Sequence, residues 1–480
     1  MKLSALLQDV ENKSMLTSDP EITGVTDSTE KIRRGCAFVC IAGDKADGHD
    51  FAAKALEKGA TVVVCQRELE IRNSIIVDDT RKAYALMCAA FYGNCSRKMR
   101  IIGITGTNGK TTTSFLLRSI LEDAGIKTGL MGTVNVEIGK EKYPADLTTP
   151  DPADLHRYLM LMHIAGCEAC VMEVSSQSLV QQRVYGIEFD CGVFTNLSPE
   201  HLDYHKTFED YCKAKQILFK NCRKAVINGD SDFAQMMKSA CKGGIVTYGT
   251  DEKFDFSAKN IQLDKNGVKY TLTAYGVEYK INYPMTGSFS VYNSMAALST
   301  AHLSGADIKK SAETLATFSG IEGRMEKLPN TMGINIIIDF AHTPDSLLNA
   351  LKTLRSVYNG RLITVFGCGG DRDKQKRPAM GKIACENSDV VFVTSDNPRT
   401  ENPEAIIRDI TGELEYKNYH KITDRTMALK SAVSCAKRGD TILVAGKGHE
   451  KYQIMGTQKI YYNEREIIKR LLEDKARFEK

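Results

Sequence analysis

The stretch GTNGKTT, residues 106–112, combines glycines, a lysine and threonines in a pattern typical of a phosphate-binding loop. It follows the apolar run RIIGIT and precedes an amphipathic helix pattern, so it lies at a strand-to-helix turn. Glycines there let backbone N–H groups face phosphate oxygens, and the helix N-terminus adds a positive dipole. Lys110 can neutralise the β- and γ-phosphates, and the Thr111 hydroxyl can reach Mg²⁺. Gly103 is one residue too far upstream for the common spacing, so the loop is the compact GxxGKT form. A turn that merely starts a helix would not explain the lysine and the threonines, and we expect a mononucleotide site.

A second candidate is Lys215, which falls within the apolar stripe of the predicted helix 208–219. Such a lysine either extends its ammonium to water along a buried stem or is kept inward for chemistry. Upstream, TNLSPEHLDYH contributes His201, and Glu173 ends the predicted strand ACVME. These three residues could meet at the mouth of the phosphate loop. Because an ammonium would repel Mg²⁺, the inward interpretation requires a lysine that has been modified into an anion.

Four loops in the C-terminal third each follow a predicted buried strand: DFAHTPD, GCGGDRD, SDNPR and AGKGHE. The carboxyl ends of parallel strands are where ligands bind. Arginines pair with carboxylates, while Glu450 or Asp396 can hold an ammonium, so this edge predicts a site for a small zwitterion. The alternative is four solvated turns that share an edge by topology. The charged residues brought to this edge are Arg372, Arg399, Lys447, His449 and Glu450.

Composition describes an ordinary globular protein of 480 residues, with 42% hydrophobic and 26% charged residues. A net charge of +4 is small for this length, so we expect no nucleic-acid partner and no binding to a membrane surface. The fourteen cysteines are scattered, and the CxxC at Cys167–Cys170 has no second pair at zinc spacing, which favours buried, reduced thiols. The first residues lack an export signal, and no apolar run has the length of a membrane span. We expect a cytoplasmic monomer.

The distribution of strand and helix patterns predicts an α/β protein of three domains, 1–98, 99–323 and 324–480. The first is a small α/β domain. The second opens with the phosphate loop and continues with near-continuous apolar runs, which suit a parallel sheet covered on both faces. Between about 253 and 285 the pattern alternates around Asn266-Gly267, which predicts a hairpin and a side β-sheet. In the third domain the strand–helix alternation resumes, as in Rossmann-like folds.

Eight motifs occur in the order GTNGKTT, MEVSSQSLVQQR, TNLSPEHLDYH with YCKAK downstream, GRME, DFAHTPDSL, GCGGDRDKQKRP, DNPRTENP and AGKGHE. Together they span essentially the whole chain, and the chain resembles the Mur ligase family. The resemblance implies an ATP-binding P-loop domain between a UDP-substrate-binding domain and an amino-acid-binding domain. It also implies that Lys215 is N-carbamylated, which removes the conflict between a lysine and Mg²⁺.

Carried over by motif, the resemblance implies roles for residues in the nucleotide and metal sites. Thr111, Glu173, His201 and carbamylated Lys215 would surround Mg²⁺, and Lys110, Lys215, Glu173 and His201 would be the catalytic residues. ATP would contact residues of the phosphate loop and three further positions, namely Gly106, Thr107, Asn108, Gly109, Lys110, Thr111, Thr112, Asn293, Arg324 and Asp339.

The same resemblance implies two binding sites for the substrates that are joined. The UDP-muramoyl-peptide would contact Ser28, Asp44, Lys45, Ala46, Thr148, Thr149, Ser175, Gln181 and Arg183. Relatives usually have Asp-Ser-Arg where this chain has DST at 27–29, so an arginine is missing near the uridine. Diaminopimelate would contact Arg372, Asp396, Asn397, Pro398, Arg399, Gly446 and Glu450. In this interpretation Arg399 binds the distal carboxylate that lysine lacks, with Glu401 and Asp396 available to orient it.

The implied activity is ATP-dependent amide formation between UDP-N-acetylmuramoyl-L-alanyl-D-glutamate and meso-diaminopimelate, a step of peptidoglycan precursor synthesis for the cell wall. A sister ligase that adds L-lysine or another amino acid, or a folate polyglutamylating ligase, would share the phosphate loop and the lysine. A regulatory P-loop switch is a third alternative, but the sequence contains no NKxD guanine signature.

Overall fold

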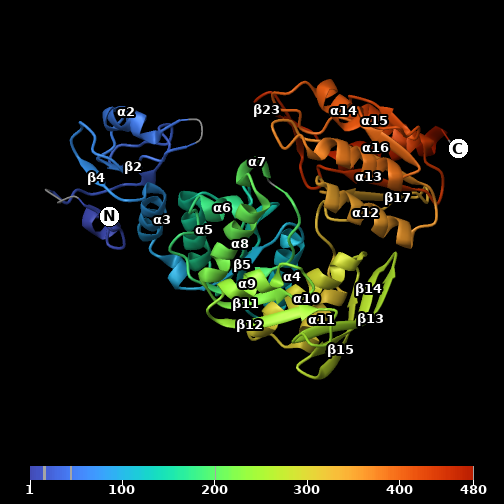
Figure 1. The fold of residues 1–480 in the computed structure, drawn as a ribbon, viewed down its shortest axis with the longest axis horizontal. Helices are drawn as coiled ribbons and strands as arrows, with labels where there is room; N and C mark the ends of the chain where they lie inside the picture. The colour runs from blue at the N-terminus through green and yellow to red at the C-terminus, as the bar shows by residue number, and fades with distance from the viewer. Residues whose placement is uncertain (14–17, 44–45, 201, 479–480) are drawn as a thin grey trace.

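A computed structural model of the chain describes residues 1–13, 18–43, 46–200 and 202–478. It has three sheet-containing bodies in a crescent, with the N-terminal body in blue at one end and the C-terminal body in orange and red at the other (Figure 1). The class expected from the sequence, α/β with parallel sheets, is confirmed. The division at residues 98 and 323 stays a prediction.

The N-terminal body is a four-stranded parallel sheet in the order β1-β2-β3-β4. Helix α3 carries buried residues along most of its length and packs on the sheet, and Gly186 of the central body lies against Leu86 of α3. The elements are β1 (Val25–Thr26), β2 (Ala37–Val39), β3 (Val62–Cys65), β4 (Ser74–Ile76), α1 (Leu3–Leu6), η1 (Gly48–Phe51), α2 (Ala52–Glu57) and α3 (Thr80–Phe91), followed by η2 (Cys95–Arg97).

The central body is built on an eleven-stranded sheet in the order β15-β14-β13-β12-β11-β10-β5-β9-β6-β7-β8. Strands β5, β6, β9, β10, β11 and β12 are parallel, and β7, β8, β14 and β15 join through antiparallel pairs. The strands are β5 (Arg100–Thr105), β6 (Thr128–Met131), β7 (Asn135–Ile138), β8 (Glu141–Pro144), β9 (Ala169–Glu173), β10 (Phe189–Phe194), β11 (Cys222–Asn228), β12 (Gly244–Gly249), β13 (Phe256–Asp264), β14 (Gly267–Ala274) and β15 (Val277–Tyr283).

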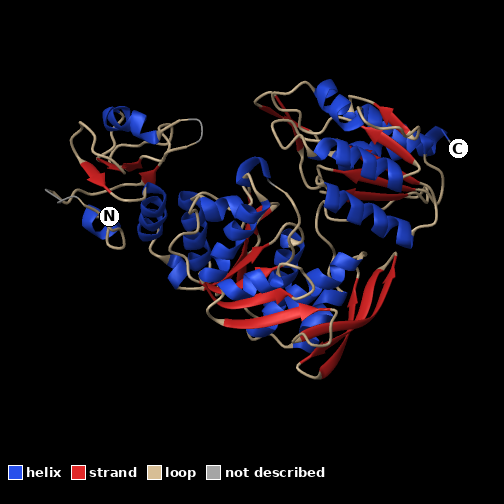
Figure 2. Ribbon diagram, in the orientation of Figure 1, coloured by secondary structure: helices blue, strands red, loops and turns tan. Residues whose placement is uncertain are grey.

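The predicted side sheet is present but is not separate. Strands β13, β14 and β15 form antiparallel hairpins, as Asn266-Gly267 predicted, and they project from the main sheet (Figure 2). They remain joined to it because β12 pairs with β13 through Tyr248–Phe256 and Gly249–Ser257. The difference arises because a short parallel pairing between two strands leaves no signal in the alternation pattern of either one.

Helices cover both faces of the central sheet, because alternate residues of each strand point to opposite sides. Ile102 and Ile104 pack with α4, α10 and α11, whereas Ile101 packs with α5, α8 and α9. The helices are α4 (Lys110–Asp123), α5 (Pro152–Ile164), α6 (Ser176–Val180), α7 (Leu202–His205), α8 (Phe208–Lys220), α9 (Ala234–Ala240), α10 (Ser288–Leu303) and α11 (Ile308–Ala316).

The C-terminal body has a six-stranded sheet in the order β16-β17-β21-β18-β19-β20, parallel except for β16. Leu362 and Phe366 of β18 face α12, α13 and α14, while Ile363 and Val365 face α15 and α16. A separate hairpin, β22–β23, follows the sheet. The elements are β16 (Glu326–Leu328), β17 (Asn335–Asp339), β18 (Leu362–Phe366), β19 (Val390–Val393), β20 (Tyr419–Lys421), β21 (Thr441–Ala445), β22 (Tyr452–Met455), β23 (Gln458–Tyr461), α12 (Pro344–Val357), α13 (Lys376–Asn387), α14 (Pro403–Thr411), α15 (Arg425–Cys435) and α16 (Glu464–Phe478).

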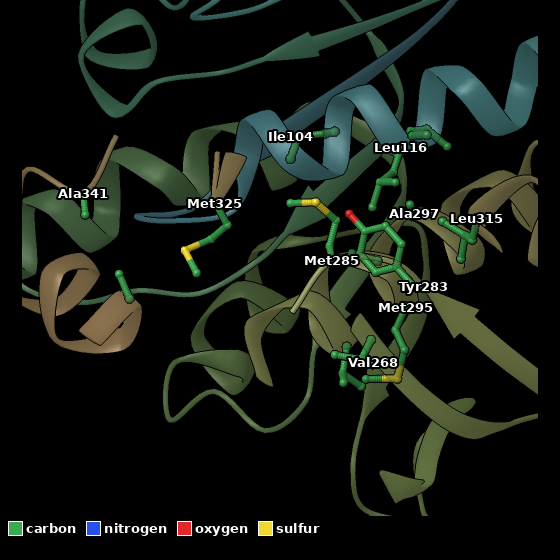
Figure 3. Close-up of a cluster of buried hydrophobic side chains, with 14 of the residues drawn as sticks. Ile104, Leu116, Val268, Tyr283, Met285, Met295, Ala297, Leu315, Met325 and Ala341 are labelled. Atoms are coloured by element: carbon green, nitrogen blue, oxygen red, sulfur yellow. The ribbon is translucent and has the colours of Figure 1, made fainter. Parts of the chain in front are cut away.

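One hydrophobic cluster is shared by the central and C-terminal bodies. It runs from Ile104 and Met285 through Met325 and Ala341 to Leu347 of α12. Figure 3 shows Met325 between Ala341, at the left, and Met285 and Ile104. The N-terminal body has its own clusters.

The sequence predicted reduced cysteines and no segment that spans a membrane. The fourteen cysteines, which all lie in the described residues, are free thiols. Within the part of the chain that the structure describes, no helix is both long enough and apolar enough to cross a bilayer.

Candidate functional site

The phosphate loop connects β5 to α4, and two of its positions require glycine. Gly106 and Gly109 have φ angles of 152° and 86°, and Lys110 is the first residue of α4. A Cβ at Gly106 would lie 1.9 Å from the Thr195 hydroxyl oxygen, and one at Gly109 would lie 2.4 Å from Asn293 Oδ1. These close approaches place Asn293 directly behind the loop.

Lys110 folds over the loop that precedes it. Its Nζ donates hydrogen bonds to the carbonyl oxygens of Gly106 (2.9 Å) and Thr107 (2.8 Å). Burial lowers the pKa of Lys110, while the nearby carboxylates of Glu200 and Glu173 act in the opposite direction. The ammonium therefore lies at the loop mouth, where a phosphate group would meet it.

Glu173, at the end of β9, is fully buried and is held by hydroxyl and amide donors. It accepts hydrogen bonds from the Thr111 hydroxyl (3.0 Å), the Thr133 N–H (2.9 Å) and the Thr133 hydroxyl (2.9 Å). Arg324 Nη2 donates to the Thr111 hydroxyl oxygen over 3.0 Å. Thr111, Glu173 and Arg324, expected at the metal and ATP sites, thus form one connected group. Thr133 belongs to it too and was missed.

Lys215 lies on α8, which begins at the cap residue Thr207, whose hydroxyl accepts the N–H of Asp210. The lysine is 1% exposed, and its Nζ donates to the Gly106 carbonyl oxygen (2.9 Å) and stacks on the Tyr211 ring. Burial, and then the charge of Lys110, hold the pKa of Lys215 well below its ordinary value. Its ammonium therefore does not extend to water. His201 lies outside the described residues.

A cavity opens between the phosphate loop and the C-terminal body. Asp339 ends β17, and its carboxylate accepts the N–H of Met325 (2.7 Å), next to Arg324. Burial raises the pKa of Asp339, and Arg324 lowers it. The lining residues are Thr107, Asn108, Gly109, Lys110, Thr111, Thr112, Thr133, Thr148, Glu173, Glu200, Arg324, Asp339, Phe340, Ala341, His342 and Ser346. The central body and the C-terminal body both contribute to this wall.

A second group of predicted residues lies beside Glu173. The Thr149 hydroxyl donates to the Glu173 carbonyl oxygen (2.8 Å), and the Ser175 N–H donates to that hydroxyl (3.0 Å). Arg183 donates to the Thr149 carbonyl (2.9 Å) and to Gln181 Oε1 (2.6 Å). Thr148 joins through the Thr133 hydroxyl, 3.1 Å away. The structure therefore brings together the five central-body residues that the sequence predicted for the UDP-muramoyl-peptide.

The candidates in the N-terminal body lie on another part of the crescent. Ser28 follows β1, and its hydroxyl accepts the N–H of Glu30. Ala46 is exposed and its carbonyl accepts the N–H of Gly43. At Thr29, where an arginine was expected, Lys58 Nζ donates to the backbone carbonyl (2.9 Å). Asp44 and Lys45 lie outside the described residues.

At the carboxyl edge of the C-terminal sheet, two arginines lie close together. Arg399 Nη1 donates to the carbonyl of Gly370 (2.8 Å), and Arg372 Nη1 to that of Asp371 (2.9 Å). Burial and then the charge of Arg372 lower the pKa of Arg399. Among the ion pairs of the described residues, neither guanidinium has a carboxylate partner. The carboxylates of Asp396, Glu450 and Asp371 act on Arg399 from nearby without pairing with it directly, so the two guanidiniums keep donors for an anionic ligand.

The remaining candidates surround these arginines. Asn397 Nδ2 donates to Glu450 Oε2 (2.8 Å), and the fully buried Lys447 donates to Asn397 Oδ1 and to Glu450 Oε2, both over 3.0 Å. Gly446 has φ 111°, and a Cβ there would lie 2.6 Å from Asp396 Oδ2. Pro398 is buried within the same turn.

One expectation for this edge was wrong. Glu401 does not orient the guanidinium of Arg399: it forms an ion pair with Arg377 and accepts the N–H of Asp371. The guanidinium of Arg399 is held by the carbonyl of Gly370 instead. Arg377 was missed because an arginine within the basic run DKQKRP reads as a surface residue.

The glycine-rich loop between β5 and α4, at the carboxyl edge of a parallel sheet, is that of a P-loop nucleotide-binding protein. Comparison with known proteins identifies the family. Residues 21–92 match the Mur ligase family catalytic domain, residues 104–301 the Mur ligase middle domain, and residues 323–448 the Mur ligase glutamate ligase domain. The chain belongs to the Mur ligase family.

Individual relatives extend over the whole chain. The UDP-N-acetylmuramoyl-L-alanyl-D-glutamate–2,6-diaminopimelate ligase of Clostridium botulinum is 41% identical, over 99% of this chain and 100% of the relative. A solved structure of a ligase of the same name is 30% identical, covers 99% of both chains and has a TM-score of 0.72. A folylpolyglutamate synthase of Mycobacterium tuberculosis, solved with ADP, is 18% identical, over 76% of this chain and 92% of that chain, with a TM-score of 0.63, and shares the fold.

Proposed function

We propose that the protein is an ATP-dependent ligase that joins meso-diaminopimelate to UDP-N-acetylmuramoyl-L-alanyl-D-glutamate in peptidoglycan precursor synthesis. The observation that carries the proposal is that Arg372 and Arg399 lie side by side and neither forms an ion pair among the described residues. The chain is also 41% identical over its length to a UDP-N-acetylmuramoyl-L-alanyl-D-glutamate–2,6-diaminopimelate ligase. Diaminopimelate differs from lysine by a second carboxylate, which two guanidiniums can bind. Action as a cytoplasmic monomer stays a prediction.

The phosphate loop is the site proposed for ATP. Lys110, the loop N–H groups and the start of α4 form a positive pocket for the phosphates, with Asn293, Arg324 and Asp339 around it. The D-glutamyl carboxylate attacks the γ-phosphorus, the bond to the ADP oxygen breaks, and an acyl phosphate results. Lys110 stabilises the charge that develops on the transferred phosphoryl group.

The residues near Glu173 fit a magnesium ion. Mg²⁺ prefers oxygen ligands, and Glu173 supplies a buried carboxylate beside the hydroxyl of Thr111. Within the described residues no group of three His, Cys, Asp or Glu side chains could hold a metal, so further oxygen ligands must come from phosphates, water or a modified residue. Bound there, the ion would neutralise phosphate charge.

Lys215 is the residue proposed to be modified. Burial and the charge of Lys110 lower the pKa of Lys215 and so favour its uncharged amine, the form that reacts with CO₂. The product, a carbamate, is an anion with two oxygens. Its formation from the amine and CO₂ releases one proton and would place a negative charge suited to Mg²⁺ beside Lys110. His201 completes the proposed set of ligands.

The second half of the reaction needs diaminopimelate at the C-terminal edge. Arg399 and Arg372 would bind its distal carboxylate, and Asp396 and Glu450 its ammonium group. Its free amine attacks the acyl phosphate, phosphate leaves, and an amide remains. The cavity wall from the C-terminal body would keep water from the acyl phosphate.

The first substrate is proposed to extend from the N-terminal body to the phosphate loop. Its peptide end would contact Thr148, Thr149, Ser175, Gln181 and Arg183, which lie together beside Glu173. Its uridine end would contact Ser28 and the 44–46 loop. Arg183, 14% exposed in its side chain, forms an ion pair with the more exposed Asp151 (3.3 Å) and would offer its guanidinium to an anionic group of this substrate.

A sister ligase for L-lysine is disfavoured because lysine would leave the half-buried Arg399 without a carboxylate partner in the complex, which costs about 2–5 kcal/mol. The folate alternative is supported only by the fold, over 76% of the chain.

The test is an amino-acid screen. Purified protein, MgATP and UDP-N-acetylmuramoyl-L-alanyl-D-glutamate are incubated with single amino acids, and ADP release and the product mass are measured. We expect ADP release to require meso-diaminopimelate and the product to contain it. Equal turnover with L-lysine, or ADP release independent of an amino acid, would contradict the proposal.

A further inference from the structure

Arg377, near the start of α13, is fully buried below the loops that carry Arg372 and Arg399. Its guanidinium donates to Glu401 Oε1 (2.9 Å) and Oε2 (3.0 Å), to Asp409 Oδ2 (2.7 Å) and to the carbonyl of Gly369 (3.3 Å). A buried charged group of this kind costs free energy unless it is paired, so its position is set mainly by Glu401, which binds it through both carboxylate oxygens. The reaction described above does not use it.

Glu401 connects Arg377 to the first of the two loops. Its carboxylate also accepts the N–H of Asp371 over 2.6 Å. The hydrogen bonds from Arg377 are the main cause that lowers the pKa of Glu401 to about 2. Glu401 is therefore an anion near neutral pH, held between α13 and the 369–373 loop.

The two loops are interlocked above this ion pair. The Asp371 carboxylate accepts the hydroxyl (2.8 Å) and the N–H (3.2 Å) of Thr400, and the Gly370 N–H donates to the Asn397 carbonyl over 2.9 Å. A Cβ at Gly370 would lie 1.9 Å from the Pro398 carbonyl oxygen. Even one added methyl group would thus force the loops apart.

Arg399 depends on this arrangement in its backbone and in its side chain. Arg399 and Asp371 both have φ 52°, a conformation that non-glycine residues adopt only where their surroundings impose it. The Arg399 side chain is held by the carbonyl of Gly370. Since Arg372 and Arg399 repel each other, a fixed framework is needed to keep both at one ligand.

We propose that Arg377 is a positioning residue for amino-acid recognition: through Glu401 it holds the 369–373 and 395–401 loops together, so that Arg372 and Arg399 face the same carboxylate. The inference rests on the proposed function, because it takes diaminopimelate as the ligand. It predicts that weakening the Arg377–Glu401 ion pair lowers diaminopimelate affinity and selectivity, while ATP binding at the phosphate loop is unaffected.

The test compares Arg377→Lys and Glu401→Gln with Asp409→Asn, a change to the other carboxylate partner of Arg377, 46% exposed in its side chain. Steady-state kinetics are measured with varied meso-diaminopimelate, L-lysine and ATP. A misplaced binding group lowers catalytic efficiency by about tenfold to a hundredfold. Arg377→Lys and Glu401→Gln should therefore raise the KM for diaminopimelate by that factor and reduce the preference for diaminopimelate over L-lysine. The KM for ATP should stay within about twofold in every variant, and Asp409→Asn should keep all parameters within about twofold.

Gly370→Ala provides an independent variant that leaves no buried charge unpaired. It should reproduce the increase in the KM for diaminopimelate with an unchanged KM for ATP, and it decides the outcome if Arg377→Lys does not fold. A folded Arg377→Lys or Gly370→Ala protein with the wild-type preference for diaminopimelate would overturn this inference and leave the proposed function standing. The same would follow if Asp409→Asn lost as much diaminopimelate affinity as Arg377→Lys and Glu401→Gln. A wild-type protein without diaminopimelate-dependent ADP release would overturn the proposed function as well.

Discussion

Thr133 donates two hydrogen bonds to Glu173, one from its backbone N–H and one from its hydroxyl, each 2.9 Å long. These bonds, with that of Thr111, fix the orientation of a buried carboxylate proposed as a Mg²⁺ ligand. Groups that orient a metal ligand typically contribute tenfold to a hundredfold in activity, about 1.4–2.7 kcal/mol.

Thr133→Val removes the hydroxyl and keeps the side-chain shape. We expect kcat/KM to fall about tenfold to a hundredfold, and the Mg²⁺ concentration for half-maximal rate to rise. ADP release at varied Mg²⁺ is the measurement. Thr317→Val, which changes the exposed threonine directly after α11, serves as the control. An unchanged Mg²⁺ dependence would contradict this role for Thr133.

Lys110→Ala removes the cation proposed for the transferred phosphoryl group. The loss of such a group costs about 3 kcal/mol or more, so kcat should fall by about two orders of magnitude or more. ADP release under saturating substrates measures the effect. Turnover near that of the wild type would exclude Lys110 from the reaction.

Lys215→Ala removes the proposed carbamate. We expect almost no activity, partly restored by acetate or formate, small anions that can occupy the space of the carbamate. Lys213→Ala changes an exposed lysine on the same helix and should keep full activity with no response to the anions. Full activity of a folded Lys215→Ala protein would refute the carbamate.

Arg399→Ala should raise the KM for diaminopimelate with little change in that for ATP. Loss of an arginine–carboxylate contact in a binding site costs about 2–5 kcal/mol, which corresponds to roughly thirtyfold to several thousandfold. Competition between meso-diaminopimelate and L-lysine, read from the product masses, measures the preference. A variant with the wild-type preference would leave the pair Arg372–Arg399 without a role in selectivity.

The ion pair of Glu401 with Arg377 should make the stability of the fold depend on pH. The pKa of its carboxyl is lowered from 4.5 to about 2, first by Arg377, so the ion pair stabilises the fold above about pH 4.5. This stabilisation is lost as the pH falls toward 2. Urea unfolding of wild type and Glu401→Gln should differ most near neutral pH and converge in acid. A difference that grows with acidification would contradict the direction of this shift.

Much of the fold could be predicted from the sequence because its signals are local. Apolar runs mark the parallel strands, and the glycines and Lys110 mark the turn between β5 and α4. Periodicity placed Lys215 in an apolar stripe, and the structure buries it.

Residues whose role depends on contacts between distant segments could not be predicted. Thr133 lies 40 residues from Glu173, and Arg377 lies 24 residues from Glu401. A threonine in a turn and an arginine in a basic run carry no pattern that reveals such a partner. For the same reason the sequence suggested the wrong partner for Glu401, since proximity along the chain favoured Arg399.

The hydrophobic cluster from Ile104 through Met325 to Leu347 has a consequence for biosynthesis. The N-terminal body has clusters of its own and can fold as soon as it leaves the ribosome. The central body cannot complete its packing against α12 until the chain has been made beyond Leu347. Synthesis should therefore pass through a stage with one folded body and a long nascent segment whose core is still incomplete, the stage at which a chaperone would have most to protect.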